Sequence, residues 1–172
     1  GACMWYDQAA IVLYMTHFVS PMIFSYILWL TDRKRFKEFR SVIILTSYMA
    51  LVTYIIYPMA PPWMAARDGY MPPLEAVGSS CERLYLPFMS IFLLVNANPV
   101  AAMPSLHMAY PYLIFLYSIR YFRHKGLITV LLPFGMVFAT VYMAQHYVID
   151  LLAGILYAHI AAHFVSKHLD RF

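Results

Sequence analysis

Two short stretches of the sequence place ionisable side chains at the start of otherwise apolar segments. In AQHYVIDLLAG, His146 and Asp150 stand four residues apart, which puts them on one face of a helix. A carboxylate in that position can hold one imidazole nitrogen and leave the other free. A histidine oriented in this way can attack phosphorus, so the pair predicts a nucleophile at His146.

The second stretch, AAMPSLHMAY, supplies partners for that nucleophile. Pro104 suits the first turn of a helix, so we expect Ser105 and His107 in a turn whose free N–H groups bind anions. Ser105 adds a hydroxyl donor, and His107 can protonate a departing oxygen. Two histidines, a carboxylate and a hydroxyl at a helix N-terminus predict a phosphoryl-transfer site that needs no metal.

Two other kinds of site use the same residue types. Two histidines and an aspartate can bind zinc, but the sequence contains no HExxH, and of these groups only His146 and Asp150 share a face. A proton or ion pathway also uses intramembrane Asp and His, but the inner halves of the apolar segments offer no matching chain of groups. We interpret three further histidines as hydrogen-bonded structural residues: His17, His159 and His163.

The composition indicates a membrane protein. Of the 172 residues, 63% are hydrophobic and only 12% are charged, and the mean hydropathy is +0.66. A soluble domain of this size cannot cover so much apolar surface with so few polar side chains. The 15 tyrosines also suit the two membrane interfaces. We therefore predict an all-α fold, a polytopic transmembrane helical bundle.

Hydropathy divides the chain into five predicted spans, since a crossing helix needs about 20 mostly apolar residues. These spans are residues 9–30, 41–57, 104–119, 127–145 and 147–165. Residues 58–103 lie between the second and third spans, and their apolar part, RLYLPFMSIFLLVNANP, predicts a short interfacial or re-entrant helix. No repeat or low-complexity linker divides the chain, so we expect one membrane-embedded domain over residues 1–172.

The net charge of +4 is distributed as a topology signal. With five spans, all of the 12 Lys and Arg residues except Arg67 and Arg83 fall on one face of the membrane. The positive-inside rule makes that face cytoplasmic, and we expect no nucleic-acid partner. Both polar stretches, the N-terminus and residues 58–103 are then extracytoplasmic.

Cys3 and Cys81 share that extracytoplasmic side, where disulfides persist. A bridge would tie the N-terminus to the 58–103 segment. Two unrelated thiols are at least as compatible with the sequence, because pairing cannot be deduced from it.

At these residues the sequence resembles a known family. MPSLH and HYVID are similar to the second and third signatures of the type 2 phosphatidic acid phosphatase superfamily, PSGH and SRxxxxxHxxxD. The order APPW, AMPSLH, QHYVIDLLAG resembles most closely its inositol phosphorylceramide synthase branch, from about residue 57 onward. The resemblance implies that His146 forms a phosphohistidine and that Asp150 orients it. It also implies that His107 protonates the leaving group and that Ser105 contacts the phosphate.

The sequence departs from the family pattern in three places. Ala139 and Thr140 stand where the usual Ser-Arg pair would be, so one phosphate-binding arginine is missing. The first signature, KxxxxxxRP, is absent at the outer end of the second span. The family core has six spans, so we expect one N-terminal span to be lost or to lie outside this sequence.

Arg67 is the predicted replacement for the missing phosphate ligand. It follows the APPW turn on the face of the polar stretches, and a guanidinium can bind two phosphate oxygens at once. Asp68 could instead hold Arg67 in a solvated surface pair. Arg83 is the reserve ligand, and we expect Arg83, Trp63 and Tyr147 to line the substrate site.

Together these features predict an integral membrane enzyme that cleaves or transfers a lipid phosphate ester at the extracytoplasmic face, in a plasma, inner or endomembrane. It would act through a phosphohistidine, with no metal or other cofactor. The resemblance favours a transferase with a lipid or polyol acceptor. A plain phosphatase for phosphatidic acid or a polyprenyl (pyro)phosphate remains open. So does a non-catalytic lipid-binding or transport protein, although the complete set His107, His146 and Asp150 argues against it.

Overall fold

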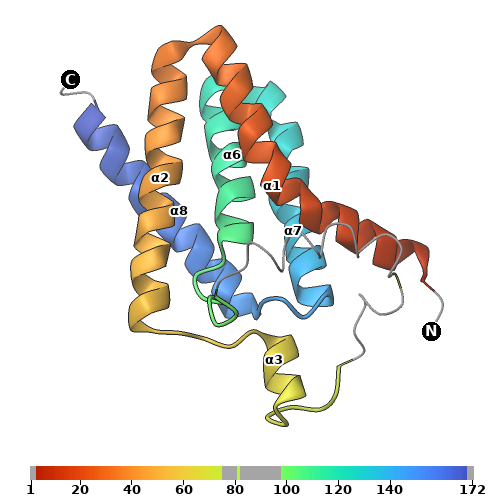
Figure 1. Ribbon diagram of the computed structural model, residues 1–172. Helices are drawn as coiled ribbons and strands as arrows, with labels where there is room; N and C mark the ends of the chain where they lie inside the picture. Colours follow the sequence, from red (N-terminus) through yellow and green to blue (C-terminus); the bar gives the residue numbers. More distant parts are fainter. Residues whose placement is uncertain (1–2, 75–80, 82–97, 170–172) are drawn as a thin grey trace.

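The computed structural model describes residues 3–74, 81 and 98–169, and among these it contains helices and no β-strand. The predicted all-α class is therefore confirmed. The elements, in chain order, are α1 (Trp5–Thr31), α2 (Arg33–Ile56), the short α3 (Pro62–Arg67), α6 (Leu106–Phe122), the 3₁₀ segment η1 (Arg123–Val130), α7 (Leu131–Tyr142) and α8 (Val148–Leu169). Figure 1 shows the long helices as one bundle with α3 beyond one end.

Four helical stretches of the described chain are long and apolar enough to cross a membrane. Three of them are α1, α2 and α8, which match predicted spans. The fourth, Leu106–Tyr142, joins the third and fourth predicted spans into one stretch of 37 residues that turns back at η1. The predicted interfacial helix at 83–99 lies largely outside the described residues.

The reversal at η1 corrects the predicted span at residues 127–145. Its first residues belong to η1, and α7 has only 12 residues, or about 18 Å of helix, against a hydrocarbon thickness of about 30 Å. Arg123 adopts a positive φ of 56° where α6 ends. A Cβ on Gly126 would lie 2.3 Å from the carbonyl carbon of Ser118, so the turn packs backbone against backbone. Hydropathy placed the break between the two spans at residues 120–126, but it did not predict that the 3₁₀ segment extends to Val130.

The turn between α1 and α2 is a single residue, Asp32. Its side chain accepts hydrogen bonds from the backbone N–H groups of Lys34 and Arg35, which caps α2. Helix α2 therefore begins at Arg33, well before the predicted start of the second span at residue 41. The basic run lies on the first turns of the helix.

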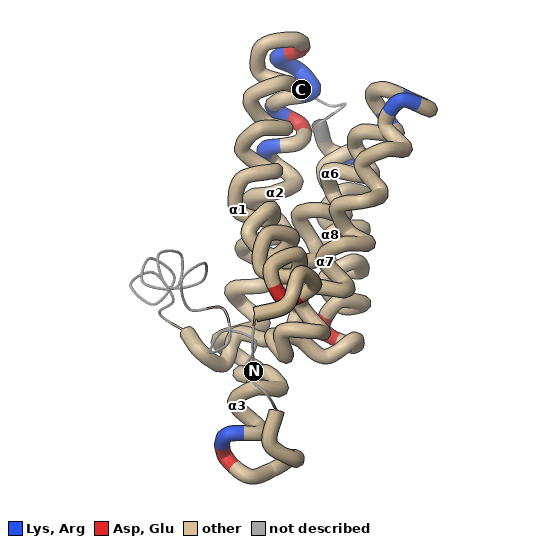
Figure 2. Tube along the Cα trace, turned by 90° about the vertical axis from the view of Figure 1, so that its right-hand side faces the viewer, with Lys and Arg blue, Asp and Glu red and all other residues tan. Residues whose placement is uncertain are grey.

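Lys and Arg residues gather at one end of the bundle (Figure 2). They lie at the α1–α2 turn, around η1 and near the end of α8. Arg67 lies on α3 at the opposite end. The described residues thus show the separation of positive charge that the sequence predicts.

Helix α6 is the centre of the packing, since it contacts α1, α2, α7 and α8. Its apolar face contributes Leu113, Ile114 and Tyr117 to the larger core cluster, together with Phe39 of α2 and Ala161 of α8. A functional group at the first turn of α6 is consequently held by several helices at once.

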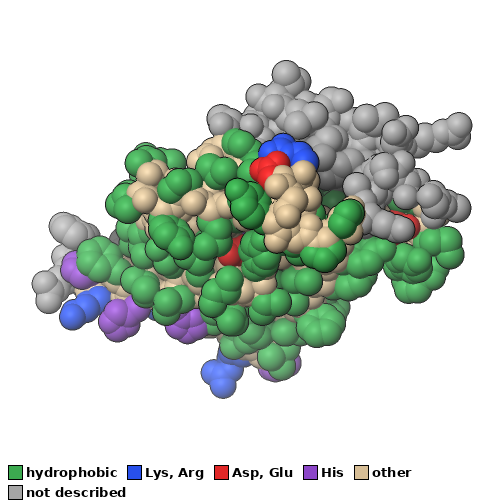
Figure 3. All heavy atoms as spheres, turned by 90° about the horizontal axis from the view of Figure 1, so that it is seen from below, with side chains coloured by type: hydrophobic (Ala, Val, Ile, Leu, Met, Phe, Trp, Pro, Cys, Tyr) green, Lys and Arg blue, Asp and Glu red, His purple; other side chains and the backbone are tan. Residues whose placement is uncertain are grey.

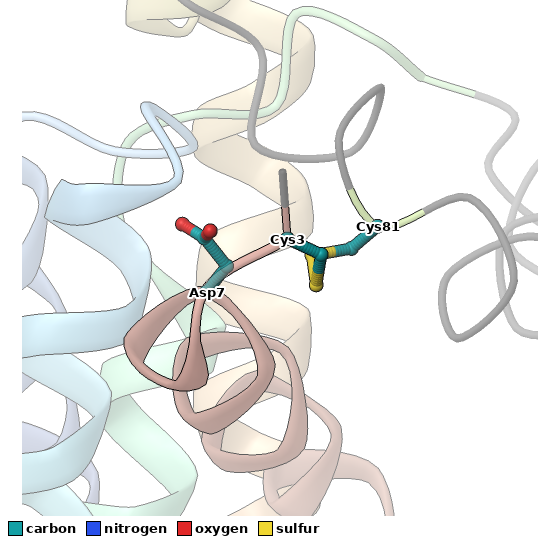
Figure 4. A group of neighbouring side chains, drawn as sticks. All are labelled: Cys3, Asp7 and Cys81. Carbon is teal, nitrogen blue, oxygen red and sulfur yellow. A yellow bond between two sulfur atoms is a disulfide. The ribbon is translucent and has the colours of Figure 1, made fainter. Parts of the chain in front are cut away.

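A disulfide joins Cys3 and Cys81, with the two Cα atoms 5.0 Å apart (Figure 4). The pairing that the sequence left open is therefore present in the structure. Asp7 lies beside the bridge and accepts hydrogen bonds from the backbone N–H of Met4 and the hydroxyl of Tyr142. Among the described residues, Cys3, Asp7 and Cys81 are the one group whose donor atoms converge as metal ligands would. Its two sulfur atoms are already bonded to each other.

We expect both cysteines to resist maleimide until the protein is reduced, because the bridge leaves no thiol. Opening this loop of 78 residues should lower the stability by about 2–4 kcal/mol, seen as an earlier thermal transition. Mass spectrometry of labelled protein, with and without reductant, checks the pairing. Labelling of unreduced protein would contradict it.

Candidate active site

His146 and Asp150 lie where the chain enters α8. His146 precedes the helix, and Asp150 lies in its first turn, fully buried. One oxygen of Asp150, Oδ2, accepts a hydrogen bond from the backbone N–H of Tyr147 at 2.8 Å and lies 3.5 Å from Nδ1 of His146. The carboxylate therefore caps α8 and faces the imidazole, although the two residues do not share a helical face as the sequence suggested.

Ser105 and His107 lie at the start of α6. The prediction that Pro104 occupies the first turn is wrong, because α6 begins at Leu106 and Ser105 is its N-cap. The Ser105 hydroxyl accepts from the N–H of Met108 at 3.3 Å, which uses its oxygen as a cap and leaves its hydrogen to donate.

The two polar stretches meet through the histidines. Nδ1 of His107 lies 2.9 Å from Nε2 of His146. Nδ1 of His146 lies 3.5 Å from Oδ2 of Asp150 and has no hydrogen-bond partner among the described residues. A proton placed on that nitrogen, toward the carboxylate, would leave the lone pair of Nε2 to accept from His107. The nitrogen expected to attack phosphorus is thus the one that His107 touches.

A close approach of two helices makes this contact possible. The N–H of Ser105 donates to the carbonyl oxygen of Asp150 at 2.9 Å, joining α6 directly to α8. A Cβ on Gly154 would lie 2.3 Å from the Ser105 carbonyl oxygen. Only a residue without a side chain allows α8 to lie this near to the first turn of α6.

The loop that presents His146 is shaped by the end of α7. The carbonyl oxygen of Thr140 accepts from the N–H groups of both Gln145 and His146, at 2.9 and 3.3 Å. Ala144 adopts a positive φ of 53°, and its carbonyl oxygen accepts from the N–H of Trp63 on α3 at 3.0 Å. The backbone of Trp63 is therefore bonded to the loop that carries His146.

Comparisons with known proteins identify the family of the chain. Residues 3–164 match the model of the PAP2 superfamily, the type 2 phosphatidic acid phosphatases. The chain belongs to the PAP2 superfamily. The match includes α1 and α2, whereas the motif resemblance begins only at residue 57.

This PAP2 member also resembles a curated protein. Over 160 residues, 87% of this chain, it is 30% identical to the phosphoinositol dihydroceramide synthase of Bacteroides thetaiotaomicron. The matched part covers 52% of that relative, so the chain spans about half its length. No solved structure matches the chain.

Arg67 lies apart from the histidines of this PAP2 site, on the outer end of α3. Its Nε donates to Oδ1 of Asp68 at 2.7 Å, and its side chain is 60% exposed. The guanidinium holds the pKa of the Asp68 carboxyl below its ordinary value, chiefly through that hydrogen bond. This is the geometry of the surface pair left open above. Arg83 lies outside the described residues.

Two aromatic residues of α1, Tyr14 and His17, also reach the PAP2 site. Their rings lie 4.6 and 4.0 Å from the ring of His107, measured between centroids. The sequence analysis interpreted His17 as a hydrogen-bonded structural residue, and the structure gives it a hydrogen bond to the carbonyl oxygen of Tyr14. The contact of either ring with His107 was not predicted. The available signal was their spacing of three residues inside a span without charge, which puts both on one helical face.

Proposed function

We propose that this chain transfers a phosphate-bearing group from a membrane lipid through a covalent intermediate on Nε2 of His146. The contact series Asp150, His146, His107 carries the proposal, with its separations of 3.5 and 2.9 Å. Asp150 orients the nucleophile and balances the charge that His146 gains on attack. His107 is the one acid of this series that can reach the leaving oxygen.

The proposed reaction has two steps. In the first, the Nε2 lone pair of His146 forms a bond to phosphorus, the bond from phosphorus to the leaving oxygen breaks, and His107, which enters the step as an imidazolium, gives that oxygen a proton and becomes neutral. In the second, His107 takes the proton from an acceptor hydroxyl, the acceptor oxygen bonds to phosphorus, and the nitrogen–phosphorus bond breaks. Ser105 would donate its hydroxyl hydrogen to a non-bridging phosphate oxygen.

One observation favours a lipid hydroxyl over water as acceptor, and a second favours a phosphodiester over a monoester as donor. Ser105 and Asp150 are fully buried and His146 is 5% exposed, and hydrophobic side chains cover most of the described surface at this end (Figure 3). Among the described Lys and Arg residues, Arg67 alone lies at this end, paired with Asp68. So little positive charge suits a phosphodiester, which carries one negative charge, better than a monoester with two.

The similar synthase suggests the substrates to try. We propose a phosphoinositol-bearing phospholipid as donor and a dihydroceramide-like lipid alcohol as acceptor, by analogy with the name of that relative. We further propose that the site faces away from the cytoplasm, because the positively charged end of the bundle is the opposite one.

A two-donor assay tests this proposal. Detergent-solubilised protein is given either the phosphoinositol lipid or phosphatidic acid, each with and without dihydroceramide, and products are followed by mass spectrometry and inorganic phosphate release. We expect headgroup transfer from the diester only when the acceptor is present. Phosphate release from phosphatidic acid without an acceptor would instead identify a phosphatase, and binding without turnover would identify a lipid-binding protein.

Excess EDTA should leave this activity unchanged. The proposed chemistry uses a nitrogen nucleophile and an imidazole acid, neither of which needs a metal. One aspartate and two histidines also supply too few oxygen ligands to bind a hard cation such as magnesium. The measurement compares initial rates with and without chelator after dialysis. Activity that is lost to EDTA and restored by magnesium or zinc would contradict the phosphohistidine mechanism.

Arg67→Lys should reduce turnover roughly tenfold if Arg67 binds the phosphate, because lysine keeps the charge but loses the two-pronged contact. Asp68→Asn is the matched control: it frees the guanidinium from its ion pair and should not reduce turnover. Initial rates at saturating donor make the comparison. Near-normal rates in Arg67→Ala, with a loss in Arg83→Ala, would transfer the role to Arg83.

A further inference from the structure

His107 has few groups that fix the plane of its ring. Its Nδ1 meets His146, while its Nε2 is buried and has no hydrogen-bond partner among the described residues. One hydrogen bond is a weak restraint on rotation of the imidazole ring about its Cβ–Cγ bond. Its orientation therefore depends on the side chains packed against it.

Two of those side chains come from one helical face of α1. The Tyr14 ring is stacked on His107, with 27° between the ring planes. The His17 ring lies nearer, at 4.0 Å between centroids and tilted by 56°. Tyr14 and His17 also touch each other, at 5.6 Å, so the three rings form one cluster beside the nucleophile.

His17 is itself held in place. Its Nδ1 lies 2.9 Å from the carbonyl oxygen of Tyr14, and a carbonyl only accepts, so Nδ1 of His17 carries a proton. The ring is 6% exposed and also packs against Phe18, at 3.7 Å between centroids. This hydrogen bond and the close packing make His17 a more rigid support than an unbonded apolar side chain would be.

We propose that His17 is a positioning residue of the active site, which holds the His107 imidazole in the orientation that delivers its proton. The proposal rests on the function proposed above, since it assigns His107 the role of acid. In this role His17 acts through His107, whose ring it contacts. The alternative is that His17 merely packs α1 against α6.

A comparison of leaving groups separates these two roles. A lipid alcohol needs the proton of His107 to depart, whereas nitrophenolate departs without it. His17→Asn keeps an N–H near the Tyr14 carbonyl but removes the ring that touches His107. We expect it to lower kcat by roughly 10–100-fold with the lipid diester, and less than about threefold with a nitrophenyl phosphodiester.

Three further variants sharpen the test. His17→Phe restores a ring and should recover most of the lipid activity. His163→Asn, an exposed histidine of α8, should change neither rate. In a His107→Ala background, His17→Asn should cause no additional loss, because its effect passes through the missing ring. Equal losses with both leaving groups, or additive losses in the double variant, would overturn the proposal.

A measurement that needs no turnover tests the positioning role of His17 separately from the proposed function. In protein labelled with ¹⁵N-histidine, the His107 and His146 nitrogen resonances report their hydrogen bond whether or not the protein turns over. We expect them to shift in His17→Asn and to stay unchanged in His163→Asn. Unshifted resonances in His17→Asn would overturn the positioning role. A wild-type protein that forms no phosphoenzyme would refute only the function.

Discussion

His146→Ala should abolish phosphorylation of the protein and reduce turnover by a factor on the order of 10⁴ or more, because it removes the atom that bonds to phosphorus. His107→Ala should behave differently. With a lipid leaving group it should lose roughly 10²–10⁴-fold, but a nitrophenyl substrate should still phosphorylate it, since that leaving group needs little protonation. Acid-quenched protein, probed for an acid-labile phosphate by mass spectrometry, distinguishes the two variants.

The control for this pair is His159→Ala. His159 is exposed on α8 and bonds to Tyr112, so its loss alters a histidine of the same bundle outside the site. Its phosphoenzyme level should match that of the wild type. Equal trapping by His146→Ala and His107→Ala with the nitrophenyl substrate would show that the two roles are assigned wrongly.

Gly154→Ala should cost roughly 100-fold in activity per folded molecule. Its Cβ would lie 2.3 Å from the carbonyl oxygen of Ser105, a backbone atom that no rotamer change can move. The first turn of α6 must then shift by about 1 Å, which carries His107 away from His146, and such a displacement can cost about 10²-fold. The overpacking itself should lower the stability by about 1–3 kcal/mol.

Two other glycines separate the site effect from the stability effect. A Cβ on Gly126 meets backbone just as closely, but at η1, so Gly126→Ala should lose stability while its folded fraction stays active. A Cβ on Gly135 meets the end of the Leu13 side chain at 2.8 Å, which can rotate away, so Gly135→Ala should do little. Thermal unfolding and activity per folded molecule are measured for all three. If Gly126→Ala loses as much specific activity as Gly154→Ala, the local explanation fails.

Local patterns made several features predictable. The α1 span follows from its uncharged apolar sequence, and the contact of His146 with Asp150 follows from their short separation, which survives although His146 lies outside the helix. The pair of Arg67 and Asp68 was foreseeable as an alternative, since adjacent opposite charges need no tertiary structure to meet.

Features made by distant backbone contacts were not predictable in this way. The α-helix of the span predicted at 127–145 begins only at Leu131, because the chain before it forms η1, where Gly126 packs on the backbone of Ser118. Hydropathy measures apolar composition and does not register such a backbone contact. Ser105 was placed in the first turn of α6, whereas it is the N-cap just before that turn, because capping depends on the observed backbone angles. His17 reaches His107 from ninety positions earlier, through the packing of α1 on α6, which no local pattern encodes.

The hydrogen bond between His107 and His146 also determines the state of the enzyme between turnovers. At 2.9 Å, the N–H of His107 occupies the very lone pair with which His146 would attack. Phosphorus and its leaving oxygen do not fit into that gap, so an arriving phosphate must first part the two rings. In the mechanism proposed above, this hydrogen bond would therefore have to break before His146 could attack. The apparent affinity of the protein for a substrate would then be lower than the intrinsic affinity of the site, by the free energy needed to break the hydrogen bond between His107 and His146.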